Sequence, residues 1–307
     1  MEAPSVPVGL ATGASVAVRL LIALTAVISL AGACSAAEPS GSHARHTAPD
    51  TVIAGPQGRV AQFIAACAVS HRAFDDPIVH PGAPGASHQH VFFGNTAVTA
   101  GATYDDLIGA ETTCDQRLDT ASYWAPVLLD ADGRAVVAEG AVAYYRPGPG
   151  VDPTSLVPYP PGLQLVAGDA AATAPQPLSV VAWSCGVSAV RSTEPPACPA
   201  RSTLRLLVTF PDCWDGERIG ADDHTDAADR HAVYSAAGEC PETHPVPIPQ
   251  LQFAVDHPPV EPDGLTLSSG PIHTAHADFW NAWDQDKLVT EVESCLHRDI
   301  TCGVTAN

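Results

Sequence analysis

The stretch "SYWAPVLLDADGRAVVAEGAVAYYR", Ser122 to Arg146, decides the fold class of this 307-residue chain. It holds two or three short runs rich in Val, Tyr and other apolar residues, which is the composition of strands. The tetrapeptide "DADG", Asp130 to Gly133, separates two of them. Asp and Gly accept the backbone angles of a tight turn, so this stretch predicts consecutive strands joined by a hairpin.

Similar runs recur outward from this stretch and predict further strands. They are "GLQLVAG" (162–168), "LSVVAWSC" (178–185) and "STLRLLVTF" (202–210). The chain also has 29 Pro and 24 Gly but one Met, and 16% of its residues are charged. Frequent turn residues of this kind favour a loop-rich β protein over a helical one.

One segment near the C-terminus favours a helix instead. In "HADFWNAWDQDKLVTEVESCL" (276–296), apolar residues recur near a 3.6-residue period. That period is typical of a helix with one face buried on a sheet. We therefore expect a mainly β fold: one β-sandwich or jelly-roll-like domain over residues 58–307, with a C-terminal helix packed on it.

The N-terminal segment is expected to direct export. Residues 18–33 are apolar apart from Arg19 and end in small residues, so residues 1–33 are interpreted as a signal peptide. Cleavage after Ala33 leaves Cys34 first, in "LAGAC", a sequence similar to a bacterial lipobox. Either Cys34 is lipidated, or ordinary cleavage makes it incidental. Residues 34–57 are small, polar and without period, which is typical of a tether between a membrane anchor and a domain.

Cysteine number supports an exported chain. There are nine cysteines, and eight remain if Cys34 is set aside. Eight cysteines allow four disulfides, which suit an oxidising compartment. Close spacing along the chain favours a nearest-neighbour scheme, in which each bridge closes a polar loop. The expected pairs are Cys67–Cys114, Cys185–Cys198, Cys213–Cys240 and Cys295–Cys302.

Charge and motif content exclude several function classes. A net charge of -20 argues against nucleic acid as a partner, because nucleic-acid binding needs a Lys/Arg surface. The sequence contains no G-x-S-x-G elbow, H-E-x-x-H pair, P-loop or dinucleotide fingerprint. A membrane is expected as a partner only through a lipid on Cys34.

An ordered series of short blocks resembles a known family. The blocks include "DDPIVHPGAPGASHQHVFFGN", "SYWAPVLL", "WSCG", "FPDCWDG" and "HADFWNAWDQDKL", and the similarity runs from about residue 74 to 302. They are similar to the family DUF1996, whose members are exported proteins of actinobacteria and fungi. The resemblance implies kinship and export, and it implies no reaction because the function of the family is unknown.

Two histidines in the first block are candidate metal ligands. If residues 87–93 form a strand, its period of two places His88 and His90 on one face, where two imidazoles can reach one ion or substrate. The spacing Gly82-x5-His88-x-His90 also matches the start of the cupin metal motif, but the Glu that should follow is absent. The alternative is that both histidines are structural.

Two further segments are expected at the same site. His276 and Asp278 form a second alternating pair, with His276 a third candidate ligand and Asp278 a candidate acid or base, or a helix cap. Asp212 and Asp215 flank Trp214 in "FPDCWDG", an arrangement that suits sugar binding or acid–base work, or alternatively a turn. We expect all three segments to line one cleft.

Two functions remain open from the sequence. The first is an exported hydrolase or lyase that acts on polysaccharide, with His88, His90, His276, Asp212, Asp215 and Asp278 as catalytic candidates. The second is a non-catalytic surface module that binds glycan or metal. Imidazole with carboxylate ligation favours a divalent transition metal over calcium as the cofactor of either. A carboxylate that converges with the histidines would favour the enzyme.

Overall fold

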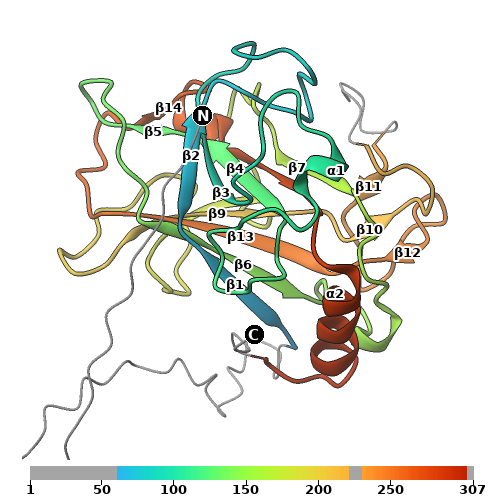
Figure 1. Cartoon of the computed structure of the whole chain (residues 1–307). Coiled ribbons are helices and arrows are strands. Elements are labelled where there is room, and N and C mark those ends of the chain that lie inside the picture. Colours follow the sequence, from blue (N-terminus) through green and yellow to red (C-terminus); the bar gives the residue numbers. More distant parts are fainter. Residues whose placement is uncertain (1–60, 221–229, 303–307) are drawn as a thin grey trace, which may run out of the picture. The chain divides into compact units, whose positions relative to one another are not determined.

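Two five-stranded antiparallel sheets form the body of the protein in the computed structural model, which describes residues 61–220 and 230–302 (Figure 1). The expected signal peptide, the tether and Cys34 lie outside the described residues. In the order of pairing, sheet 1 contains β1 (Phe63–Cys67), β6 (Gly140–Arg146), β13 (Gln250–His257), β9 (Leu204–Thr209) and β8 (Val181–Cys185). Sheet 2 contains β2 (Val69–Ala73), β3 (His90–Gly94), β4 (Ser122–Pro126), β15 (His276–Trp280) and β7 (Gln164–Gly168).

Smaller elements surround the two sheets. The short strands are β5 (Leu128–Leu129), which pairs with β14 (Thr266–Leu267), and β10 (Cys213–Trp214), which pairs with β11 (Ala232–Val233) and β12 (Val246–Pro247). The helices are α1 (Tyr104–Leu107), α2 (Gln285–Glu291), the π-helix η4 (Val292–Leu296) and the 3-10 turns η1 (Pro153–Ser155) and η3 (Ile272–Thr274). No helix among the described residues is both long and apolar enough to cross a bilayer.

The chain passes from sheet 1 to sheet 2 between its first two strands, β1 and β2. Only Ala68 separates β1 from β2, and the two strands follow one continuous path in Figure 1. The first half pairs with β6 of sheet 1, and the second half pairs with β3 of sheet 2. A strand that changes sheets in this way closes one corner of a sandwich, so the two sheets are joined covalently at that corner.

Aromatic rings from both sheets meet in the core. Phe253 of sheet 1 lies 5.6 Å from Phe93 and 5.4 Å from Tyr123, both of sheet 2, measured between ring centroids. All three side chains are buried. Complete burial of a side chain of this size contributes about 1.5–3 kcal/mol, so the facing rings are a main source of stability. The mainly β sandwich expected from the sequence is confirmed.

The sequence located β4, β6, β7, β8 and β9, did not locate β1, β2 or β13, and misplaced the start of the helix. The hairpin turn at Asp130 to Gly133 is present, with the amide of Gly133 donating to the carbonyl of Asp130 at 2.9 Å. The helix expected over residues 276–296 begins at Gln285, and its first part is instead β15. All five residues of β15 are buried. A strand covered on both faces lacks a clean polar alternation, which is why its apolar residues matched a helical period.

The four expected disulfides are all present. They are Cys67–Cys114, Cys185–Cys198, Cys213–Cys240 and Cys295–Cys302. Cys295 belongs to η4, so the last bridge ties the end of the helical segment to the C-terminal stretch. Each bridge closes a loop and so restricts the unfolded chain, which stabilises the folded chain relative to the unfolded one.

A polar network crosses the core between the sheets. The Tyr123 hydroxyl donates to Asp119 Oδ2 at 2.7 Å and also contacts the Tyr145 hydroxyl. Trp283 Nε1 donates to that same Tyr145 hydroxyl at 3.0 Å. Burial raises the pKa of Asp119 from its ordinary value near 3.8 to about 8. The acid therefore stays protonated through neutral pH, because its charged form is poorly solvated in the core.

Replacement of Asp119 by Asn should change how stability depends on pH. An acid with a raised folded pKa binds a proton on folding, so the free energy of unfolding of the wild type falls as pH rises from about 4 to about 8. Asp119→Asn removes this contribution, which has a slope of at most about 1.4 kcal/mol per pH unit. Urea denaturation of both proteins across this pH range measures the difference, and parallel stability curves would contradict the assignment.

Candidate functional site

Three histidines meet over the outer face of sheet 2, the face turned away from sheet 1. His90 is the first residue of β3, and His276 is the first residue of β15. Their outward direction follows from strand alternation, since Phe93 and Phe279 point inward to the core. His88 precedes β3 rather than lying in it, contrary to the expected strand start, but its ring still lies 4.3 Å from that of His90.

The Nε2 atoms of these histidines converge on one point. His276 Nε2 lies 3.1 Å from His88 Nε2 and 3.3 Å from His90 Nε2. In a tetrahedral site with metal–nitrogen distances of about 2.0–2.1 Å, ligand nitrogens stand about 3.3 Å apart. The two distances from His276 Nε2 are thus close to those that one transition-metal ion requires. We call His88, His90 and His276 the histidine cluster.

Backbone carbonyls fix the tautomers of two members. His90 Nδ1 lies 3.0 Å from the carbonyl oxygen of Asp75, and His276 Nδ1 lies 2.9 Å from that of Thr274. A carbonyl only accepts, so each neutral ring carries its proton on Nδ1 and presents a bare Nε2. In the neutral rings these two bare nitrogens lie 3.3 Å apart, and neither can donate a hydrogen bond to the other. Two lone pairs in that position repel, unless a proton or a cation lies between them.

Burial keeps these rings neutral. Desolvation lowers the pKa of His276 from 6.5 to about 4, and it lowers the pKa of His90 well below its usual range, with His276 and His88 adding to the effect. The pKa of His88 is also lowered, first by burial and then by the charge of His80. Neutral imidazole is the form that ligates metal, so the environment favours the ligating state at neutral pH.

Two carboxyl groups adjoin the histidine cluster. Ligand atoms of Asp76, His90 and Asp278 all lie within 4.8 Å of one another. Asp278 is completely buried, and neither of its oxygens has a hydrogen-bond partner among the residues that the structure describes. Burial and the neighbouring Asp76 raise its pKa well above its ordinary value. A buried carboxyl group without a donor needs a proton or a cation, so Asp278 is either a neutral acid or a further ligand.

The main chain positions the cluster closely. Gly168 of β7 pairs with His276 and has a φ of +83°, and a Cβ built on it would lie 2.5 Å from the carbonyl oxygen of Ala275. Only glycine permits this approach. On the other side, Asp75 accepts from the amides of Gly85 and Ala100 at 3.0 and 3.1 Å, which holds the loop that leads to His88.

The structure does not bring Asp212 and Asp215 to the histidine cluster. Asp212 accepts from the amide and hydroxyl of Ser235 at 2.8 and 2.7 Å. Asp215 accepts from the amide of Glu217 and from Arg218 Nε, at 2.9 and 2.7 Å. Asp215 therefore stabilises the turn after β10, which was the alternative interpretation of this motif, and Asp212 ties the start of β10 to Ser235 after β11. The carboxyl groups that adjoin the histidine cluster are those of Asp76 and Asp278 instead.

The expected common cleft is only partly realised. A cavity of about 320 Å³ is lined by Gly168 and Asp169 beside β15, and by Pro211 of the "FPDCWDG" segment. The histidine cluster is not among its lining residues. The cavity thus places Pro211 near β7, the strand that pairs with β15, but neither His276 nor the other members of the histidine cluster line it.

Asp75 and Asp76 were not recognised from the sequence as site residues. They occur in "DDPIVHPG", where Asp before Pro and Gly is typical of a turn. Asp76 does make such a turn, because its Oδ1 accepts from the amides of Ile78 and Val79, both at 3.0 Å. Its burial against His90 and Asp278 depends on the loop folding over sheet 2, which no local pattern shows.

NMR of the metal-free protein should confirm the tautomers and the shifted pKa. His276 is expected to stay neutral at pH 6 and to titrate near pH 4, because its cation is desolvated. Its neutral ring should carry the proton on Nδ1. Long-range proton–nitrogen correlation spectra across this range report both properties. A midpoint near the ordinary value of 6.5, or a proton on Nε2, would be inconsistent with the geometry.

Comparison with known proteins identifies the family of this chain but does not indicate a reaction. A family model described as a domain of unknown function, DUF1996, matches residues 76–283, which is more than half of the chain. The match includes the whole histidine cluster together with Asp76 and Asp278. Neither the curated proteins nor the solved structures include a match to the chain. The chain belongs to the DUF1996 family.

Proposed function

We propose that the domain binds one divalent transition-metal ion through the histidine cluster, and that it is a hydrolase or lyase whose activity depends on this ion. The observation that carries the metal is the pair of bare Nε2 atoms of His90 and His276, 3.3 Å apart. Two facing lone pairs in a protein interior need a proton or a cation between them, and the lowered pKa values of both rings favour the cation.

The ligand set favours zinc, copper or another first-row ion. Three neutral imidazoles are nitrogen ligands, which calcium and magnesium avoid. Three protein ligands also leave a tetrahedral ion one open position for water or substrate, as in catalytic zinc sites. Half-buried His88 lies on the accessible side of the cluster, because His90 and His276 are 0% and 3% exposed.

The adjoining acids support a catalytic role. Metal-bound water is a nucleophile at neutral pH, and a neighbouring neutral carboxyl group can protonate a leaving group. Asp278, whose pKa is raised well above its ordinary value, supplies such a proton donor. The presence of Asp76 and Asp278 within 4.8 Å of a ligand atom of His90 therefore favours the enzyme over a simple metal-binding module.

Polysaccharide is the substrate class in this proposal, and the cell surface is the location. Four disulfides suit an oxidising compartment outside the cytoplasm. The lipobox-like sequence at Cys34 and the tether that follows it support attachment to the outer face of a membrane. Glycans of the envelope or of the surroundings are the polymers available there.

A non-catalytic metal-binding module is the second candidate. It is favoured by the burial of His90 and His276, because a polymer has little room to approach an ion that is held mainly by buried ligands. The two candidates share the metal and differ in turnover, so they can be separated by experiment.

Metal binding should depend on the histidine cluster. Calorimetric titration with zinc is expected to show one ion per domain, and His276→Gln should weaken the affinity by more than about 100-fold, because a ligand is lost. His88→Gln should also weaken it. The matched control is His257→Gln, which replaces a buried histidine whose pKa is likewise lowered to about 4 but which lies outside the cluster. Equal losses in the control, or no stoichiometric binding by the wild type, would reject the site.

Turnover should distinguish the enzyme from the module. The wild type, loaded with zinc or copper, is expected to release reducing or unsaturated ends from a panel of cell-wall and plant polysaccharides, and a chelator should abolish this release. Asp278→Asn should retain the metal and lower the rate by about 100-fold or more, because a proton donor is lost. Metal binding without turnover on any polymer of the panel would favour the module.

A further inference from the structure

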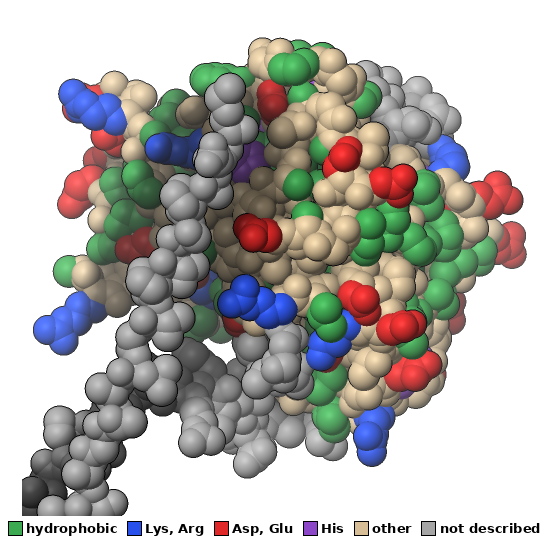
Figure 2. Space-filling view, in the orientation of Figure 1, with side chains coloured by type: hydrophobic (Ala, Val, Ile, Leu, Met, Phe, Trp, Pro, Cys, Tyr) green, Lys and Arg blue, Asp and Glu red, His purple; other side chains and the backbone are tan. Residues whose placement is uncertain are grey.

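A second polar site lies on the opposite side of the sandwich, over the outer face of sheet 1. Its cavity has a volume of about 230 Å³ and is open to solvent. The lining residues include Arg146, Arg191 and Arg205, and none of them is acidic. This is notable in a chain that has 14 Lys and Arg residues against 34 Asp and Glu. On the face shown in Figure 2, basic side chains are few and scattered.

The sheet register explains why the arginines meet. In sheet 1, Tyr144 of β6 pairs with Gln252 of β13, and Asp256 pairs with Arg205 of β9. Side chains at alternate positions of a strand share one face of the sheet, so Tyr144 and Arg146 of β6 both point outward. Arg205 of β9 lies on the same face, and both arginines contact Tyr144. The guanidinium of Arg146 lies 5.3 Å from the centre of the Tyr144 ring, and Arg205 Nη1 lies 3.3 Å from the Tyr144 hydroxyl.

Only one of the three arginines has its charge balanced. Arg205 donates from Nε to Asp256 Oδ1 at 2.8 Å. Arg146 donates to the neutral Gln252 Oε1 at 3.3 Å, and its buried Nε has no hydrogen-bond partner in residues 61–220 and 230–302. Arg191, on the loop closed by Cys185–Cys198, makes no hydrogen bond or ion pair with any residue that the structure describes. Donors of this kind in a concave site are what an oxyanion requires.

Mutual repulsion of the arginines also favours a bound anion. Burial lowers the pKa of Arg146, and the charge of Arg191 lowers it further. The pKa of Arg191 is lowered by burial and then by the charge of Arg205. Like charges held together cost free energy that a bound anion would relieve.

We propose that this cavity, defined by Arg146, Arg191 and Arg205, binds the oxyanion group of a small or polymeric ligand. Guanidinium groups bind phosphate, sulfate and carboxylate through the same paired N–H donors. The ligand class is therefore an anion that carries one of these groups. This site is separate from the histidine cluster, which lies over sheet 2, and the proposal does not depend on a bound metal.

Calorimetric titration of the purified protein with inorganic phosphate, sulfate and galacturonate tests the proposal at constant ionic strength, with chloride as the reference anion. At least one of the three should bind saturably, and the one that binds identifies the oxyanion. Arg146→Gln and Arg191→Gln should each weaken binding about tenfold or more, because a charged hydrogen bond is lost. Arg191→Gln changes an exposed side chain, so it keeps the test valid if Arg146→Gln fails to fold.

Two controls separate this site from other sources of anion binding. Arg134→Gln removes an exposed arginine that is paired with Asp132 in the hairpin turn and should leave the affinity unchanged. His276→Gln should also leave the anion affinity unchanged, because the arginine cavity does not include the histidine cluster. An anion bound through a metal ion would instead be lost in that variant. No saturable binding of the three anions, or equal weakening by Arg134→Gln and Arg146→Gln, would overturn the proposal.

Discussion

The pleat of β15 is the constraint on which the structure depends. This strand pairs with β4 on one side and with β7 on the other, so it holds a central position in sheet 2. Its alternate residues Ala277 and Phe279 point into the core, and the rings of Tyr123, Tyr145 and Tyr159 surround Phe279. The intervening residues, His276 and Asp278, must then face outward. Core packing and site geometry are therefore set by one backbone register.

The outer face of sheet 2 differs from an ordinary solvent-exposed sheet face. The segment between β2 and β4 covers it with an apolar cluster that includes Ile78, Val98 and Leu107 against Phe92 and Trp124. This cover removes water from the side chains beneath it, which lowers the pKa of the histidines and raises that of Asp278. The polar groups of the candidate site are thus tuned by the same loop that stabilises the sheet.

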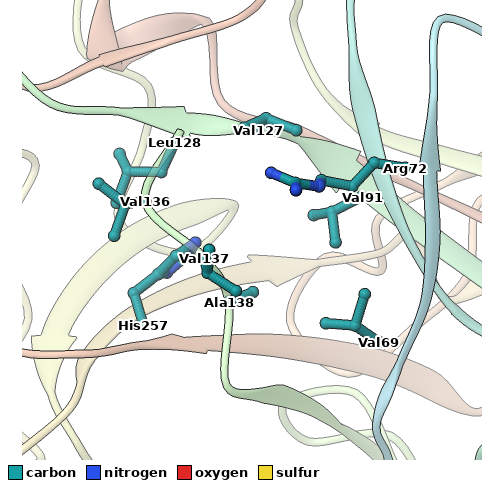
Figure 3. A pocket seen from close by; sticks show the side chains of 9 residues that line it. All are labelled: Val69, Arg72, Val91, Val127, Leu128, Val136, Val137, Ala138 and His257. Atoms are coloured by element: carbon teal, nitrogen blue, oxygen red, sulfur yellow. The ribbon is translucent and has the colours of Figure 1, made fainter. Parts of the chain in front are cut away.

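The two faces of the sandwich contrast in charge. Imidazoles with lowered pKa values and carboxyl groups with raised pKa values gather over sheet 2, whereas guanidinium groups gather over sheet 1. The apolar cavity beside His257, into which Arg72 points in Figure 3, has a volume of only about 20 Å³, which is room for a single water molecule. A β-sandwich of this design can carry two independent sites because its core isolates one face from the other.

The sequence by itself determined the features that are local along the chain. Turn residues and apolar runs located β6, β7, β8 and β9, and the spacing of the cysteines predicted all four bridges. Strand alternation also suggested that His88 and His90 lie together, and their rings are 4.3 Å apart. Each of these inferences needs only neighbouring residues, because turn geometry and side-chain direction repeat over a few positions.

The tertiary structure decided what depends on residues far apart in sequence. The order of strands brought His276 to His90 across 186 positions, and it separated Asp212 and Asp215 from both. It also made residues 276–280 a strand, since two neighbouring strands supplied hydrogen bonds that outweighed a helical pattern. Asp76 lies beside His90 of the histidine cluster only because its loop folds over sheet 2. Burial and long-range pairing are properties of the whole fold, and no short stretch of the chain contains them.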